Sequence, residues 1–99
     1  MPHHLLCYDL APDYLARRGD HRSAHLALAW RYADEGRLLL GGAVGDPVES
    51  ALLLFADAAS AAAFAVADPY VVHGLVTAWR LRPWATVVGR DAVDPIRSA

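Results

Sequence analysis

The chain has 99 residues, enough for one domain in which nearly every element must contribute to the core. Three Trp, four Tyr and two Phe make it apolar-rich, which argues against an intrinsically disordered chain. Its formal charge is −2 and its nine cationic residues are scattered arginines, so the basic patch that nucleic-acid binding requires is missing.

The N-terminal segment and the cysteine content indicate the compartment. Cys7 is the one cysteine, so no disulfide can form within the chain, which fits a reducing environment. The apolar run 5–8 has no cationic segment before it and is followed by Asp9, unlike a signal peptide. No apolar stretch approaches the roughly 20 residues of a membrane span. We therefore expect a cytoplasmic protein without a membrane partner.

The first predicted elements are a strand and a long helix. Residues 4–10 are apolar and run into a proline turn, which favours a strand. Residues 20–35 are predicted to be helical, with Asp20 at the N-cap and Gly36 in a left-handed C-cap. The helical spacing is carried by the apolar residues Leu26, Trp30 and Ala33.

Two further strands, a second helix and a last strand follow. Residues 38–40 run as a strand into a glycine-rich segment, where Gly42 is a candidate substrate contact because such glycines permit close approach of another group. Residues 50–56 are predicted to be the third strand. An alanine-rich helix capped by Asp57 must stop near residue 67, because Pro69 disfavours helical geometry before it. Residues 75–81 alternate with the period of a strand.

The order β-α-β-β-α-β is typical of an α+β fold in which two helices cover one face of a four-stranded antiparallel sheet. The opposite face is left open. Because the strands are rich in apolar residues, that face predicts packing against a second copy, and hence a homodimer. Residues 1–99 are interpreted as one domain, with a core at about 4–88 and a flexible tail at 89–99.

Three short motifs could carry chemistry. Arg22 and His25 are three apart on one helix and share a face. The run Glu35-Gly36-Arg37-Leu38 leaves that helix, and Asp68-Pro69-Tyr70 follows the second helix. Each has an ordinary structural explanation when taken singly: a helical His can be solvated, and an Asp before Pro can start a turn. His21 and His25 have a spacing that can bind a metal, but no third ligand is evident, so we expect no metal.

Together these motifs resemble the YCII (YciI-like) family, which has R-x-x-H-L in a helix, E-G-R-L-x-x-G-G leading into the second strand, and D-P-Y after the second helix. The resemblance spans roughly residues 4 to 88. It implies a ferredoxin-like dimer, a dimeric α/β barrel, in which a His and an Asp face one another in a cleft as candidate catalytic residues. By motif these are His25 and Asp68, with Arg22 and Tyr70 as candidate cleft residues.

The chemistry of such a pair follows from its groups. An imidazole titrates near neutrality, and a carboxylate bonded to one ring nitrogen fixes its tautomer. Ser23 lies on another helical face than His25, so no nucleophile is evident and proton transfer is favoured over covalent catalysis. The sequence therefore favours a cofactor-independent lyase, isomerase or eliminating dehalogenase acting on a small cyclic or phenolic compound.

Two alternatives remain open at this point. The first is a non-catalytic ligand-binding or dimerisation module of the same fold, in which the His-Asp pair is only a satisfied polar contact. The second is a cofactor-independent monooxygenase on a similar dimeric barrel, for which the sequence has no dedicated motif. An enzyme requires His25 and Asp68 within hydrogen-bond reach, with His25 open to a cavity.

Overall fold

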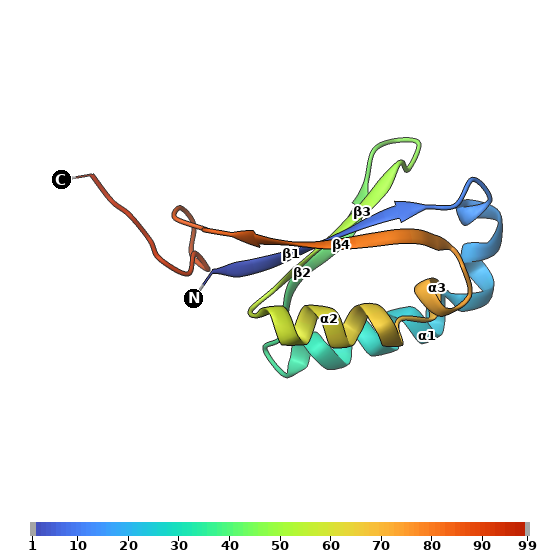
Figure 1. Cartoon of the computed structure of the whole chain (residues 1–99), viewed down its shortest axis with the longest axis horizontal. Coiled ribbons are helices and arrows are strands. Elements are labelled where there is room, and N and C mark those ends of the chain that lie inside the picture. Colours follow the sequence, from blue (N-terminus) through green and yellow to red (C-terminus); the bar gives the residue numbers. More distant parts are fainter. Residues whose placement is uncertain (1, 99) are drawn as a thin grey trace.

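A computed structural model describes residues 2–98, which form a four-stranded antiparallel sheet with helices on one face (Figure 1). The strands are β1 (His3–Leu10), β2 (Leu38–Val44), β3 (Ser50–Phe55) and β4 (Val76–Trp84), in the order β2-β3-β1-β4. The helices are α1 (Tyr14–Asp34), α2 (Ala58–Ala67) and the one-turn α3 (Pro69–Val72). The predicted α+β fold is confirmed, with α3 added between α2 and β4.

The core lies between the helices and the inward face of the two central strands, β1 and β3. Leu6 is opposite Leu53 of β3 and Leu81 of β4, and two residues later Tyr8 is opposite Ala51 and Trp79. Leu6 and Tyr8 are almost completely buried because alternate residues of a strand face the same side. On α2 they meet a complementary set of small and aromatic side chains, Ala61, Phe64 and Ala65.

The start of α1 differs from its prediction. The helix begins at Tyr14, so Asp20 lies inside it and is not its N-cap. Tyr14 is buried and packs edge-to-face against Tyr70, with ring centroids 5.6 Å apart. This long-range contact stabilises the first turn of α1, which the local sequence of residues 14–20 does not predict. Gly19, a residue unfavourable in helices, is tolerated in this part of α1. The C-terminal end is as predicted, because Gly36 has φ +75°.

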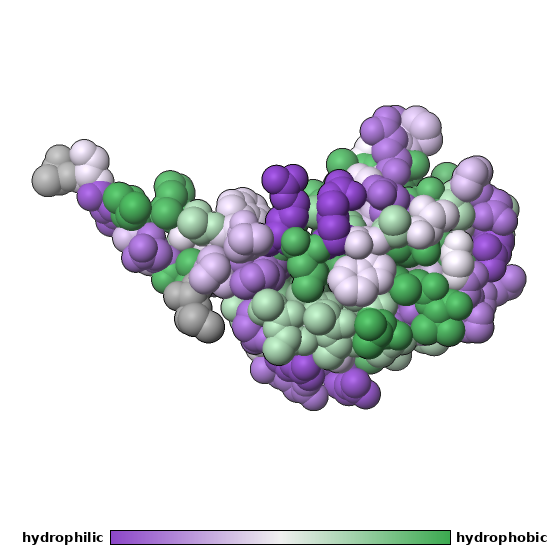
Figure 2. Space-filling model, viewed as in Figure 1, coloured by the Kyte–Doolittle hydropathy of each residue, from purple (hydrophilic) through white to green (hydrophobic). Residues whose placement is uncertain are grey.

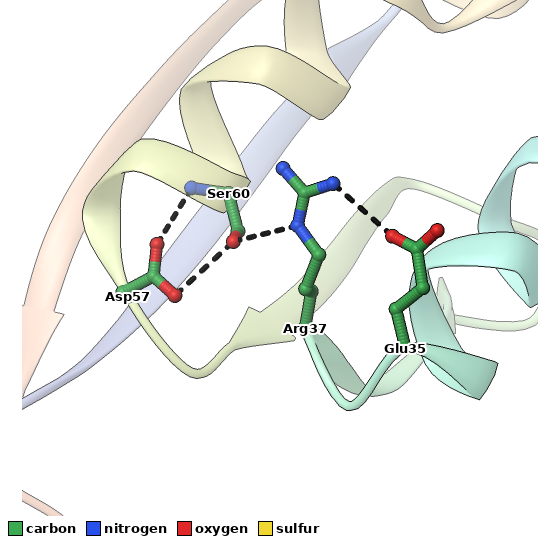
Figure 3. A network of polar contacts seen from close by, with 4 residues as sticks. All are labelled: Glu35, Arg37, Asp57 and Ser60. Carbon is green, nitrogen blue, oxygen red and sulfur yellow. Dashed lines mark hydrogen bonds and ion pairs between the residues drawn. The ribbon is translucent and has the colours of Figure 1, made fainter.

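The exit from α1 is tied to the start of α2 by polar contacts (Figure 3). Asp57 is the N-cap of α2, and its carboxylate accepts a hydrogen bond from the Ser60 backbone N–H at 2.7 Å. That bond is the main reason why the pKa of Asp57 lies below its ordinary value. Arg37 donates to the Ser60 hydroxyl at 2.9 Å and contacts Glu35 at 3.2 Å. With Gly36 at the C-terminal end of α1, all three residues of the Glu-Gly-Arg run therefore have a structural role.

The outer surfaces carry apolar groups on both sides of the molecule. Figure 2 shows apolar side chains over α2, where Val66 is 65% exposed. On the sheet face away from the helices, Leu52 is 38% exposed and Leu40, opposite Leu54, is 73% exposed. The segment after β4 runs away from the body (Figure 1), although the hydroxyl of Thr86 is hydrogen-bonded to His3 Nδ1 at 2.9 Å.

Candidate active site

His25 and Asp68 lie in direct contact. The distance between His25 Nδ1 and Asp68 Oδ1 is 2.8 Å, although the residues are 43 positions apart in the sequence. His25 comes from the middle of α1, and Asp68 joins the end of α2 to the start of α3. Because a carboxylate only accepts hydrogen bonds, His25 Nδ1 carries the proton in this pair. The lone pair of the neutral ring is therefore on Nε2.

Asp68 is held by two further donors. The Tyr8 hydroxyl donates to Oδ2 at 2.7 Å, and the backbone N–H of Tyr70 donates to Oδ1 at 3.1 Å. The Asp68 side chain is fully buried, whereas that of His25 is 15% exposed. A buried carboxylate needs such a set of partners, since an unpaired charge in this position would be strongly destabilising. The carboxylate is thus fixed from three directions and in turn fixes the imidazole.

The imidazole plane is set by its aromatic neighbours. The Tyr70 ring stacks on His25 with centroids 3.9 Å apart and planes inclined by only 7°. Phe64 contacts the imidazole edge-to-face at 6.2 Å. Stacking and the Asp68 hydrogen bond together leave the ring little freedom to turn, which is the preorganisation that a proton-transfer group requires.

His25 opens onto a cavity of about 390 Å³ between α1 and the β2 side of the sheet. Its walls are mainly apolar, and beyond His25 the lining along α1 continues with Leu26, Ala29, Trp30 and Ala33. Leu26 and Trp30, two of the three residues that carry the helical spacing of α1, are 38% and 65% exposed and face this space instead of the core. The apolar stripe of α1 is therefore largely available to a ligand.

Two tyrosines of the site remain neutral hydrogen-bond donors at ordinary pH. Burial raises the pKa of the Tyr8 hydroxyl far above its usual range, and the negative charge and hydrogen bond of Asp68 raise it further. Burial also raises the pKa of Tyr70, and the neighbouring Tyr14 adds to this effect. The cations of Arg22 and Arg18 oppose the increase at Tyr70 without cancelling it.

The structure brings together the residues that the motifs singled out. Arg22, Tyr70 and Gly42 line the same cavity as His25, and Asp68 is hydrogen-bonded to the edge of the imidazole. Gly42 pairs with Leu52, whose side chain is on the open sheet face, so Gly42 contributes backbone to the cavity.

Sequence reasoning missed Tyr8 and Arg18, although both had a signal. A tyrosine at an inward-facing strand position needs a partner for its hydroxyl, which pointed to Tyr8. Arg18 is one helical turn before Arg22, on the same side of α1, and it also lines the cavity. Its guanidinium lies over the ring of Tyr14, 5.8 Å from the centroid.

The additional histidines, His21 of α1 and His73 directly after α3, do not line the cavity. His21 stacks on His73 with centroids 4.3 Å apart, and Arg17 donates to the His73 backbone carbonyl at 2.6 Å. Within residues 2–98, no group of three His, Cys, Asp or Glu side chains could hold a metal ion. In the same part of the chain, no helix is both long and apolar enough to cross a membrane.

Comparison with known proteins agrees with this architecture. The model of the YCII-related domain matches residues 1–85. The chain belongs to this family. The match covers all of the secondary structure and every residue of the candidate site, so the resemblance noted from the motifs is confirmed at the level of the family.

A solved structure shares the fold of this YCII-related chain. It is 5-chloro-2-hydroxyhydroquinone dehydrochlorinase (TftG) from Burkholderia phenoliruptrix AC1100, in complex with 2,5-dihydroxybenzoquinone. The TM-score is 0.69 at 21% sequence identity, and the likeness covers 85% of this chain and 94% of that chain. No curated protein matches the sequence significantly. The ferredoxin-like fold of the α/β-barrel type is thus confirmed.

Proposed function

We propose that this YCII-related protein is a cofactor-independent enzyme that moves a proton on a small cyclic or phenolic compound, as a lyase, isomerase or eliminating dehalogenase. The observation that carries the proposal is the 2.8 Å contact between His25 and Asp68 at the wall of a cavity of about 390 Å³. A structural His-Asp pair needs no such cavity, whereas a proton-transfer pair needs one next to the imidazole.

In this proposal His25 is the catalytic residue and Asp68 is a positioning residue. Nε2 of the neutral imidazole removes a proton from an acidic C–H or O–H of the substrate. Asp68 accepts the hydrogen bond from Nδ1–H throughout and stabilises the imidazolium that forms. Return of the proton to another atom of the substrate completes an isomerisation. If a leaving group departs with its electron pair instead, the reaction is an elimination and the proton is released to water.

Substrate contacts are assigned to Arg22, Tyr70 and the backbone of Gly42. Arg22 supplies positive charge to an anionic or developing anionic oxygen, and the flat face of the His25-Tyr70 stack suits a planar ring. The related fold of TftG, a dehydrochlorinase complexed with a dihydroxybenzoquinone, supports a compound of this size and shape.

The test begins with binding and then asks for turnover. We expect 2,5-dihydroxybenzoquinone and related phenols and lactones to raise the melting temperature, since a ligand of the native state stabilises it. Ligands that bind are then incubated in D₂O, and proton exchange, isomerisation or halide release is followed by NMR. His25→Gln should lower these rates by about 10²–10⁴-fold. His21→Gln, one turn away on α1 and stacked on His73, is the matched control and should keep them.

The competing function is a ligand-binding or dimerisation module. It is favoured if ligands of the panel stabilise the wild type and His25→Gln equally and none of them is changed chemically. Turnover that depends on His25 but not on His21 would exclude it.

We also propose that the protein forms a homodimer through the open face of the sheet. That face exposes Leu40 and Leu52, and burial of such apolar surface stabilises an interface by about 25 cal/mol per Å² before the costs of association. Sedimentation velocity should give a dimer for the wild type and a monomer for Leu52→Lys. Val66→Lys, on the outer surface of α2, should remain dimeric, and a monomeric wild type contradicts the proposal.

A further inference from the structure

Two unpaired arginines lie at one end of the cavity. Arg18 and Arg22 are four residues apart on α1, and both line the space next to His25. Three other arginines of the chain pair with carboxylates, but neither of these two forms an ion pair within residues 2–98. Like charges at this helical spacing repel one another, so their joint position favours the binding of an anion.

A buried hydroxyl points to the same place. Tyr70 is 3% exposed, its ring lines the cavity, and its hydroxyl has no hydrogen-bond partner in the described part of the chain. Arg18, Arg22 and Tyr70 all line this one cavity, and the charges of both arginines lower the pKa of the Tyr70 hydroxyl against the effect of burial. A buried hydroxyl without a partner costs about 1–3 kcal/mol, and a ligand oxygen that accepts its hydrogen bond removes that cost.

The other end of the cavity is apolar. Beyond His25, the lining of α1 continues with Leu26 and Trp30, which are both exposed. Because α1 rises about 1.5 Å per residue, the arginines and Trp30 are separated by more than 10 Å along the helix axis. The cavity is therefore cationic at one end and hydrophobic at the other, with the imidazole between them.

We propose that the cavity selects carboxylates with a planar apolar body. The carboxylate is bound by Arg18, Arg22 and the Tyr70 hydroxyl, and the body lies along the apolar end of the cavity. A carboxylate has two acceptor oxygens in the plane that a guanidinium matches, whereas a neutral phenol offers one. The placement of the reacting atom beside His25 rests on the proposed function, but the binding preference does not require turnover.

The experiment compares two probes of equal shape, 2-naphthoate and 2-naphthamide, by isothermal titration calorimetry on the full chain. Charge-assisted hydrogen bonds predict that the carboxylate binds about 10–100-fold more tightly than the amide. Arg22→Gln and Tyr70→Phe should each reduce this ratio, and the double variant Arg18→Gln/Arg22→Gln should abolish it. Arg31→Gln, on α1 but outside the cavity, is the matched control and should preserve the ratio.

Equal binding of both probes, absence of binding by either, or a preference that survives the double arginine variant would overturn the inference. The outcome is separable from that of the proposed function. His25→Gln should retain the carboxylate preference, so a preference without any turnover supports the anion site and refutes catalysis. His25-dependent turnover of neutral phenols without a carboxylate preference supports catalysis and refutes the anion site.

Discussion

Removal of the Tyr8 hydroxyl should change the free energy of unfolding by amounts that differ between pH 8 and pH 11. In Tyr8→Phe the cavity and the ring are kept, but Asp68 loses the hydrogen bond that Tyr8 donates at 2.7 Å. Hydrogen bonds to charged groups contribute about 1.5–3 kcal/mol, so we expect the free energy of unfolding to fall by about 2 kcal/mol at pH 8. Urea denaturation followed by circular dichroism measures this difference.

The same difference should shrink in alkali. Burial and Asp68 hold the pKa of Tyr8 in the folded protein far above the ordinary value of 10.0, so the contribution of Tyr8 to stability is fully present below pH 10. Above pH 10 the unfolded chain loses this proton while the folded chain keeps it, and the wild type loses about 1.4 kcal/mol per pH unit that Tyr8→Phe does not lose. At pH 11 the two proteins should differ by only about 0.6 kcal/mol.

Tyr32→Phe is the matched control for this experiment. Tyr32 is also buried, and its hydroxyl makes no hydrogen bond to any residue between 2 and 98. It should therefore cost much less stability at pH 8 than Tyr8→Phe. Equal losses in the two variants, or a wild-type advantage over Tyr8→Phe that does not change between pH 8 and 11, would refute the assigned role of the Tyr8-Asp68 hydrogen bond.

Three further predictions test the site and its support. Asp68→Asn should lower kcat of any His25-dependent reaction by about 10²–10⁴-fold with little change in KM, because it affects the base and not the substrate contacts. Gly41→Ala places a methyl group about 3.3 Å from a Leu53 side-chain carbon and should weaken ligand binding, whereas Gly42→Ala, with nothing within 4 Å, should not; calorimetric Kd values decide. Arg37→Met should lower the melting temperature more than Glu35→Gln. Glu35→Gln removes only a half-exposed ion pair, which contributes little, whereas Arg37→Met also removes the hydrogen bond to the Ser60 hydroxyl.

The parts of the fold that depend on local chemistry could be predicted from the sequence. Asp57 is a good N-cap because its carboxylate reaches a backbone N–H three residues later, and Gly36 tolerates the left-handed conformation that ends a helix. The start of α1 could not be predicted in this way. It depends on the packing of Tyr14 against Tyr70, a contact between residues that are 56 positions apart.

In the candidate site, too, the residues in local motifs could be predicted from the sequence and the long-range contacts could not. His25, Asp68, Arg22, Tyr70 and Gly42 came from short motifs, and the structure places them at one cavity or directly beneath it. Their proposed roles await the experiments above. The hydrogen bond from strand β1 to the buried carboxylate joins residues 60 positions apart, and no local pattern specifies the pairing. The sequence indicates only that Tyr8 faces the core, because alternate residues of a strand face the same side.

The ordinary structural explanation of Asp68 and the functional one are not exclusive. Its Oδ1 atom accepts the Tyr70 backbone N–H at the start of α3 and also the Nδ1–H of His25. A capping carboxylate is positioned by the backbone on both sides of it, so the orientation of the imidazole is set by the α2-α3 junction and not by a free side chain. Asparagine can keep the cap through its side-chain oxygen but lacks the charge, so Asp68→Asn separates the two roles. Loss of turnover in a variant that still folds assigns the charge to chemistry, whereas unfolding assigns it to the core.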